Sequence, residues 1–175
     1  KRPLHKGWQE SATNDPAVIA NIWNDKPGAG IGAPTDGFVV LDLDPKGGNV
    51  DDTRKRIVDK FGPLPNTLIF ETGSGGEHYV MKQPDGTEAR SVKNAVGLMW
   101  GVDNRSDGGY IVAPGSHLDP SMKPYRIKHR APIATAPTEI VAALRRNAMR
   151  AVAGTDMEDL DSDMAVRAAS YVADG

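Results

Sequence analysis

Two aspartates close an apolar stretch of this chain. Phe38-Val39-Val40-Leu41 leads directly into Asp42-Leu43-Asp44-Pro45. Because side chains alternate along a strand, we expect Asp42 and Asp44 to point to the same side, and Pro45 to end the strand. Adjacent like charges are costly unless a cation neutralises them, and hard oxygen ligands favour Mg²⁺ or Mn²⁺. The pattern predicts a divalent metal site; the alternative is a pair of strand-end acids in solvent.

A second segment, Ser74-Gly75-Gly76-Glu77-His78, has the chemistry of a phosphate site. We expect its glycines to leave backbone N–H groups bare beside a hydroxyl, and such groups bind anionic oxygens. His78 opens the next expected strand and is a candidate donor to a phosphate oxygen. Taken by itself, the segment also fits a glycine-rich hairpin turn with a surface histidine.

The third segment is Val102-Asp103-Asn104-Arg105. Asp103 and Arg105 share one face of a strand. Beside the first two aspartates, Asp103 would be a third carboxylate for two metals, and Arg105 would neutralise phosphate. The alternative is a cross-strand ion pair of little energetic value. Asp107 is another acid nearby, but its position before Gly108-Gly109 is typical of a turn.

All three segments lie where a strand meets a turn, and a sheet can bring such ends together. Acids, a phosphate cradle and an arginine are the groups needed for metal-assisted attack on a nucleoside triphosphate. No G-x-G-x-x-G and no G-x-x-x-x-G-K-[ST] pattern occurs, so the common dinucleotide and P-loop sites are not indicated.

The remaining sequence predicts the elements that carry these residues. We expect a short helix after Asp15-Pro16, helices over 51–61 and about 137–152, and one more around 162–173. We expect strands over 67–71, 78–82 and 97–105, one over 110–113 that pairs back on its predecessor, and an irregular one within 116–130. Hairpins mixed with helices predict an α+β fold on a single mixed sheet.

Composition describes an ordinary globular chain with an acidic end. It has 175 residues, 25% of them charged, and no cysteine, which excludes thiolate zinc sites. Residues 154–175 carry six acids and one base, which leaves 20 basic and 17 acidic residues in 1–153. We expect a catalytic domain over 1–153, an acidic helical tail or linker over 154–175, and a fragment trimmed at its N-terminus. No apolar run approaches the ~20 residues of a membrane helix, and we expect a cytoplasmic location.

With these motifs in order, the chain resembles the N-terminal bifunctional primase–polymerase (Prim-Pol) domain of the archaeo-eukaryotic primase superfamily, from phage, plasmid and mobile-element replication proteins. The resemblance covers roughly residues 1–130. It is carried by Lys1-Arg2-Pro3-Leu4, Lys6-Gly7-Trp8, Ala12-Thr13, Gly30-Ile31-Gly32, residues 39–44, 74–78 and 102–105, and Asp107-Gly108-Gly109-Tyr110-Ile111-Val112-Ala113-Pro114-Gly115-Ser116.

The resemblance implies an RRM-like mixed sheet with flanking helices and template-directed nucleotidyl transfer, in primer synthesis, DNA polymerisation or both. It implies Asp42, Asp44 and Asp103 as catalytic ligands of two Mg²⁺ or Mn²⁺ ions. It also implies that the (d)NTP contacts lie at the residues Ser74, Gly75, Gly76, His78 and Arg105. The implied partners are single-stranded DNA template, primer and nucleotide, with a helicase domain or a separate helicase as a further partner.

Other functions fit parts of the sequence. A D-x-D glycosyltransferase would explain Asp42 and Asp44 but gives no role to residues 74–78 or 102–105. A HAD-type phosphatase would need Thr or Ser where this chain has Lys46. A non-catalytic nucleic-acid-binding module would use the basic segments 54–60, 123–130 and 145–150. Nucleotide incorporation on a DNA template separates these alternatives.

Overall fold

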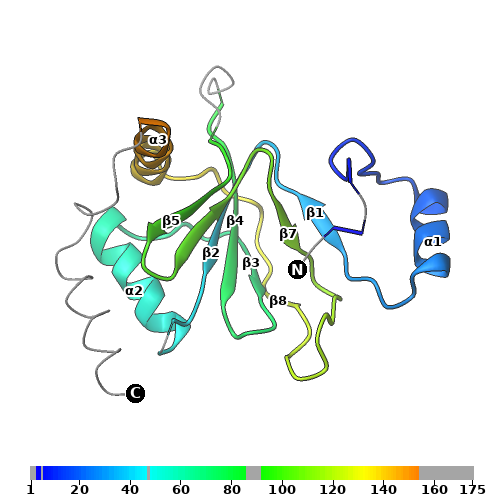
Figure 1. Ribbon diagram of the computed structural model, residues 1–175. Coiled ribbons are helices and arrows are strands. Elements are labelled where there is room, and N and C mark those ends of the chain that lie inside the picture. Colours follow the sequence, from blue (N-terminus) through cyan, green and yellow to red (C-terminus); the bar gives the residue numbers. More distant parts are fainter. Residues whose placement is uncertain (1–2, 5, 47, 86–91, 154–175) are drawn as a thin grey trace.

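The protein consists of a six-stranded sheet backed by two helices and of a smaller, projecting part. The computed structural model describes residues 3–4, 6–46, 48–85 and 92–153 (Figure 1). In chain order the elements are α1 (Pro16–Asp25), β1 (Gly32–Pro34), β2 (Phe38–Leu43), α2 (Val50–Phe61), β3 (Leu68–Glu71), β4 (Glu77–Lys82), β5 (Ala95–Met99), β6 (Val102–Arg105), β7 (Tyr110–Val112), β8 (Arg126–His129) and α3 (Thr138–Ala153).

Local signals explain where the first two helices begin and end. Asp15 caps α1 by accepting a hydrogen bond from the Ala17 N–H, and Pro16 occupies its first turn. Asn49 caps α2 in the same way, through the Asp52 N–H. Gly62 ends α2 with φ at 82°, a backbone conformation that glycine adopts without strain. The predictions of both helices are confirmed.

The six-stranded sheet has the order β5-β6-β2-β4-β3-β8. The β2–α2–β3 segment is a split β-α-β unit, since β4 lies between its two strands. With β6 on the other side of β2, the four central strands form the RRM-like arrangement that the resemblance implies. The α+β class is confirmed, but the expected mixed sheet is not: every pairing between these six strands is antiparallel.

The two faces of this sheet are covered differently. Helices α2 and α3 pack on one face around a core that includes Leu41, Ile57 and Ile140. On the opposite face Val40 and Val80 pack against Ile111 of β7 in a much smaller cluster. Because side chains alternate, the β2 residues Val39, Leu41 and Leu43 face the helices, whereas Asp42 lies on the opposite face with Val40.

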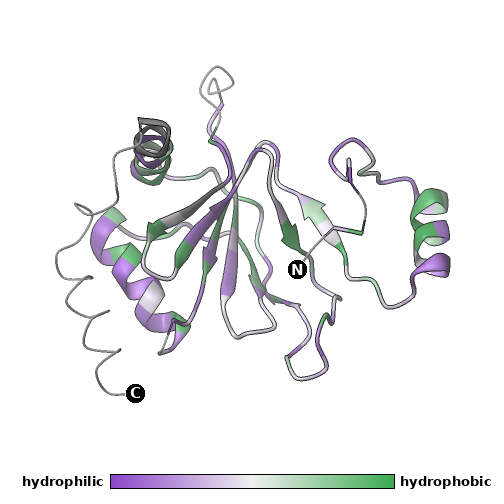
Figure 2. Ribbon diagram, in the orientation of Figure 1, coloured by the Kyte–Doolittle hydropathy of each residue, from purple (hydrophilic) through white to green (hydrophobic). Residues whose placement is uncertain are grey.

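The small sheet consists of β1 and β7, and it corrects one prediction. Residues 110–112 do not pair back on the preceding strand; they pair with residues 32–34. The helix α1 projects beyond this sheet, and none of its residues is buried. Its apolar residues, green in Figure 2, include Val18 and Ile19, which remain 43% and 36% exposed.

A second correction concerns residues 97–105, which do not form one strand. The chain turns at Trp100-Gly101, so that β5 and β6 pair as a hairpin. Gly101 has φ at 76°, and its carbonyl accepts a hydrogen bond from the Asp44 N–H at 2.8 Å. The turn therefore reaches the end of β2. The helix expected around 162–173 and the acidic tail lie outside the described residues, among which no helix is long and apolar enough to cross a membrane.

Candidate active site

Three of the predicted residues form one row across the sheet. Asp42 on β2 is the register partner of Asp103 on β6 and of His78 on β4. Residues directly opposite each other on neighbouring antiparallel strands point to the same face. Asp103 therefore lies beside Asp42, on the face that the helices leave open.

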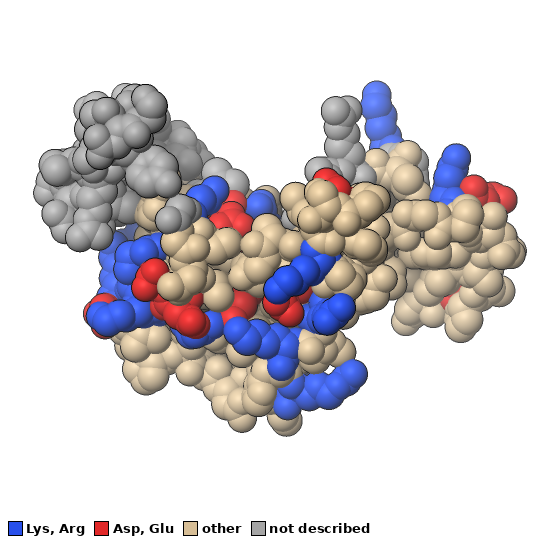
Figure 3. All heavy atoms as spheres, turned by 90° about the horizontal axis from the view of Figure 1, so that it is seen from below, with Lys and Arg blue, Asp and Glu red and all other residues tan. Residues whose placement is uncertain are grey.

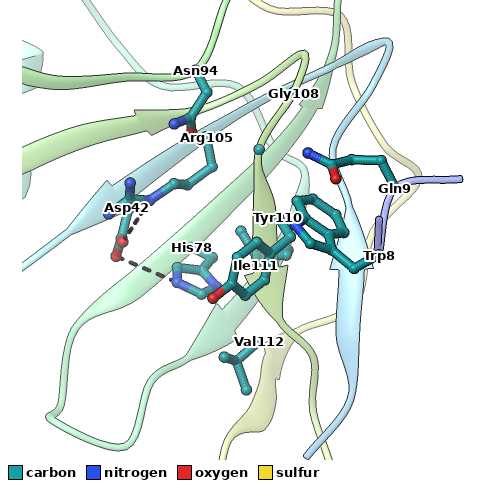
Figure 4. Close-up of a pocket in the computed structure, with 11 residues that line it drawn as sticks. Trp8, Gln9, Asp42, His78, Asn94, Arg105, Gly108, Tyr110, Ile111 and Val112 are labelled. Carbon is teal, nitrogen blue, oxygen red and sulfur yellow. Dashed lines mark ion pairs between the residues drawn. The ribbon is translucent and has the colours of Figure 1, made fainter. Parts of the chain in front are cut away.

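Arg105 and His78 contact the two acids. Arg105 lies on β6 with its Nε 3.5 Å from Asp42 Oδ2 and a terminal guanidinium nitrogen 3.0 Å from Asp103 Oδ2. His78 Nε2 lies 3.3 Å from Asp42 Oδ1 (Figure 4). His78 is buried, and its Nδ1 has no hydrogen-bond partner among the described residues. A buried polar atom in this state is uncommon and marks a candidate ligand contact.

Asp103 has a further tie to its neighbouring strand. Its Oδ1 accepts a hydrogen bond from the Gly97 N–H of β5 at 2.9 Å. The carboxylate is thus held from two sides, by a backbone amide and by Arg105. Such hydrogen bonds fix the orientation of the group before any ligand arrives.

Asp44 is held differently. Its N–H donates to Gly101 and its carbonyl accepts from the Thr53 hydroxyl of α2, which fixes its backbone just past the end of β2. Its carboxylate lies 3.6 Å from Lys46 Nζ. Within the described ranges, no three His, Asp or Glu side chains are grouped closely enough to hold a metal ion. The sharing of metals by Asp42, Asp44 and Asp103 stays a prediction.

The turn of residues 72–76 does not have the bare amides that the sequence suggested. The Gly75 N–H donates to the Thr72 carbonyl, and the Gly76 N–H donates to the Thr72 hydroxyl. A Cβ on Gly76 would stand 2.3 Å from the Leu43 carbonyl oxygen, so close packing against β2 explains this glycine. Ser74 is exposed, with its hydroxyl 3.2 Å from that of Thr72. Nucleotide contacts at Ser74, Gly75 and Gly76 stay a prediction.

A cavity of about 400 Å³ opens beside the Asp42 row (Figure 4). Three predicted residues line it, namely Asp42, His78 and Arg105. The sequence did not assign a role to the other side chains and glycines of its lining, which come from the N-terminal segment, from Asn94 and from residues 108–112. The Gly-Trp and Gly-Gly-Tyr patterns within the resemblance were the only signals that could have located them.

Glu77, beside His78 on β4, was also missed. It faces the helices and is almost fully buried, where it accepts hydrogen bonds from Arg54 of α2, at 2.6 and 3.2 Å, and from Lys128 of β8. Burial alone disfavours its charged form, but the bonds from Arg54 and Lys128 outweigh burial and hold the pKa of Glu77 below its usual value. These two ion pairs connect the site strand β4 to α2 and to β8.

Asp107 has the turn role that its sequence context favoured. Its Oδ1 accepts hydrogen bonds from the Gly37 N–H and from the Gln83 side chain, both at 2.8 Å. It therefore joins the β6–β7 connection to the start of β2. The neighbouring Asn104, which faces the helices, is buried and donates to the Lys93 carbonyl.

Comparison with known proteins identifies a family. Residues 1–139 match the Prim-Pol family, described as the N-terminal domain of bifunctional DNA primase/polymerases. No curated protein matches the chain. The family match covers most of the chain and includes every predicted site residue. It supports a role in DNA primase/polymerase-type nucleotidyl transfer, and on its basis the chain belongs to the Prim-Pol family.

Proposed function

We propose that this chain carries out template-directed nucleotidyl transfer with two Mg²⁺ or Mn²⁺ ions, in primer synthesis, DNA polymerisation or both, in phage or plasmid replication. The 3′-hydroxyl of a primer or first nucleotide would attack the α-phosphate of a (d)NTP. The new P–O ester bond forms as the bond to the β-phosphate breaks, the hydroxyl proton passes to solvent, and pyrophosphate leaves. The proposal depends on one observation: Asp42 and Asp103 lie side by side next to the cavity, in contact with Arg105, and Asp42 also contacts His78.

The two paired carboxylates fit a divalent cation. Asp42 and Asp103 are directly opposite each other on neighbouring strands, where like charges destabilise a sheet unless a cation lies near. Arg105 is that cation in this structure. The carboxylates of Asp42 and Asp103 offer the hard oxygen ligands that Mg²⁺ and Mn²⁺ prefer. Asp44 is the proposed third ligand. Bound ions of this kind lower the pKa of a hydroxyl and offset phosphate charge.

The cationic and polar side chains would orient the nucleotide. Arg105 presents a planar guanidinium that suits phosphate oxygens, and it lines the cavity together with His78. His78, whose Nδ1 has no hydrogen-bond partner among the described residues, is a proposed triphosphate contact. Ser74, with its exposed hydroxyl, is a proposed further contact, and Gly75 and Gly76, whose amides already donate to Thr72, are proposed to hold the turn that presents it.

Nucleotide incorporation on primed and unprimed single-stranded DNA, with Mg²⁺ and then with Mn²⁺, tests the proposal. Asp42→Asn should lower the incorporation rate at least about a hundredfold, since loss of a metal ligand removes several kcal/mol of transition-state stabilisation. Asp59→Asn is the matched control, because this acid lies on α2 in an exposed ion pair with Lys55. Full activity of Asp42→Asn with an unchanged melting temperature would refute the metal assignment.

The non-catalytic binding module is the second candidate. Lys and Arg, blue in Figure 3, are interspersed with Asp and Glu over the face shown rather than gathered in one basic surface. Non-specific DNA binding depends on many phosphate contacts by basic groups and weakens steeply with salt. A binding module would bind DNA in this manner and release no pyrophosphate in the same assay.

A further inference from the structure

The cavity beside the Asp42 row has two walls of different chemistry. One wall carries the charged side chains of the six-stranded sheet, Asp42 and Arg105. The other is aromatic: Trp8, from the N-terminal segment, lies edge to face on Tyr110 of β7, with ring centroids 5.0 Å apart and planes at 67°. Figure 4 shows Trp8 and Tyr110 across the cavity from Asp42 and Arg105.

Trp8 is the anchor of its segment. It is half-buried, whereas its neighbours Lys6, Gly7, Gln9 and Glu10 are exposed. A large aromatic side chain that is only partly covered at the edge of a cavity leaves ring surface for a ligand. The chain between this segment and β7 is about a hundred residues long, so the aromatic pair is assembled by the fold.

We propose that Trp8 and Tyr110 bind the nucleoside half of the incoming nucleotide, by contact of their rings with its base and sugar, while Arg105 and His78 face its phosphates. This inference rests on the proposed function. A flat, weakly polar group joined to a polyanion matches a cavity that is aromatic on one side and carries Arg105 and the proposed metal ligand Asp42 on the other. Stacking of bases on aromatic rings tolerates any base, as a polymerising site requires.

The cavity has the size for such a ligand. Its volume of about 400 Å³ falls in the usual range of small-molecule sites. Gly108 and Gly109 line it with backbone only, and a Cβ on Gly108 would meet nothing within 4 Å. A polyphosphate without a nucleoside would leave the aromatic wall unused, so the two walls together favour a complete nucleotide.

Equilibrium binding of dATP and of inorganic tripolyphosphate, each with Mg²⁺ and without DNA, tests the inference. Trp8→Ala should weaken dATP binding about tenfold and leave tripolyphosphate binding unchanged, because only the nucleoside contact is lost. Trp8→Phe keeps a ring and should retain most of the affinity. Trp100→Ala is the matched control, since Trp100 is 49% exposed in the β5–β6 turn and lies outside the cavity lining.

Unchanged dATP affinity in Trp8→Ala, or an equal loss for both ligands, would overturn the inference. If Trp8→Ala fails to fold, the fluorescence of Trp8 in a Trp23→Phe, Trp100→Phe background gives the same information. Quenching by dATP but not by tripolyphosphate supports the contact, and equal responses to both refute it. A chain that binds dATP through Trp8 yet releases no pyrophosphate on a primed template would refute the proposed function alone.

Discussion

The six-stranded sheet and the projecting part of the molecule are stabilised to very different degrees. Between the sheet and helices α2 and α3 lies a continuous core in which Leu41, Ile57 and Met81 are fully buried. The projecting part contains α1, without a buried residue, and the small sheet, which contributes only Ile111 to a cluster of buried residues. The proposed metal ligands belong to the first region, and Trp8 and Tyr110 belong to the second.

This division suits a nucleotide-transfer site. Groups that hold metals and phosphates must keep their relative positions, and the hydrogen-bonded strands of a packed sheet provide that rigidity. A wall that must accept each base in turn benefits from a less densely packed support, because such regions open and adjust at low free-energy cost. The wall of the cavity on the six-stranded sheet therefore has a fixed geometry, and the wall formed by Trp8 and Tyr110 can adapt to each base.

The largest expected effect comes from truncating the core of the first region. Leu41→Ala removes a fully buried side chain and should lower the free energy of unfolding by about 3 kcal/mol. Ile19→Ala on α1 should lower it by less than about 0.5 kcal/mol, since Ile19 is 36% exposed on a helix without buried residues. Urea denaturation measures both. Equal losses would show that the projecting part is as well packed as the sheet.

Much of this architecture could be predicted from local signals. Asp15-Pro16 predicted α1 because capping depends on a few adjacent residues. The hairpin turn at Gly101 was missed because Leu98, Met99 and Val102 read as one apolar run. The predicted pairing partner of β7 was wrong for a related reason. Residues 110–112 have strand character, but nothing in them specifies pairing with β1, about eighty positions earlier in the chain.

The candidate site divides in the same way. The residue types at positions 42, 78, 103 and 105 indicated phosphate and metal chemistry, while their common row depends on the register of three strands. The burial of Glu77 could not be predicted, because its cations Arg54 and Lys128 are 23 and 51 residues away. Trp8 lacked a predicted role because only the folded chain brings it into contact with Tyr110.

A smaller loss of stability is expected when a side chain is added where the β3–β4 turn packs closely against β2. Gly76→Ala places a methyl group against the Leu43 carbonyl, 2.3 Å from the ideal Cβ position, and neither backbone segment can move freely. We expect a loss of about 2 kcal/mol, typical of overpacking. Gly28→Ala, after α1, is the matched control, since its Cβ would meet nothing within 4 Å. Similar melting temperatures for both variants would contradict this packing constraint.

The smallest effect concerns the buried ion pair of the first region and depends on pH. The pKa of Glu77 in the folded chain lies below its unfolded value, because Arg54 and Lys128 donate to its carboxylate against the cost of burial. A lowered folded pKa gives stability that is complete above the unfolded pKa of about 4.3 and is lost as the pH falls through the folded pKa.

Glu77→Gln isolates this contribution, since its amide keeps the size of the side chain but not the charge. It should cost roughly 1 kcal/mol at pH 6, a modest value because Lys128 is half-exposed, and the difference from the parent should shrink toward pH 3. Ile19→Ala in the projecting part changes no titratable group, so its difference from the parent should stay constant across the same range. Chemical denaturation at several pH values measures the three curves. A gap between Glu77→Gln and the parent that stays constant down to pH 3 would mean that Glu77 acts by shape and not by charge, and α2 would then be held to β4 by apolar packing alone.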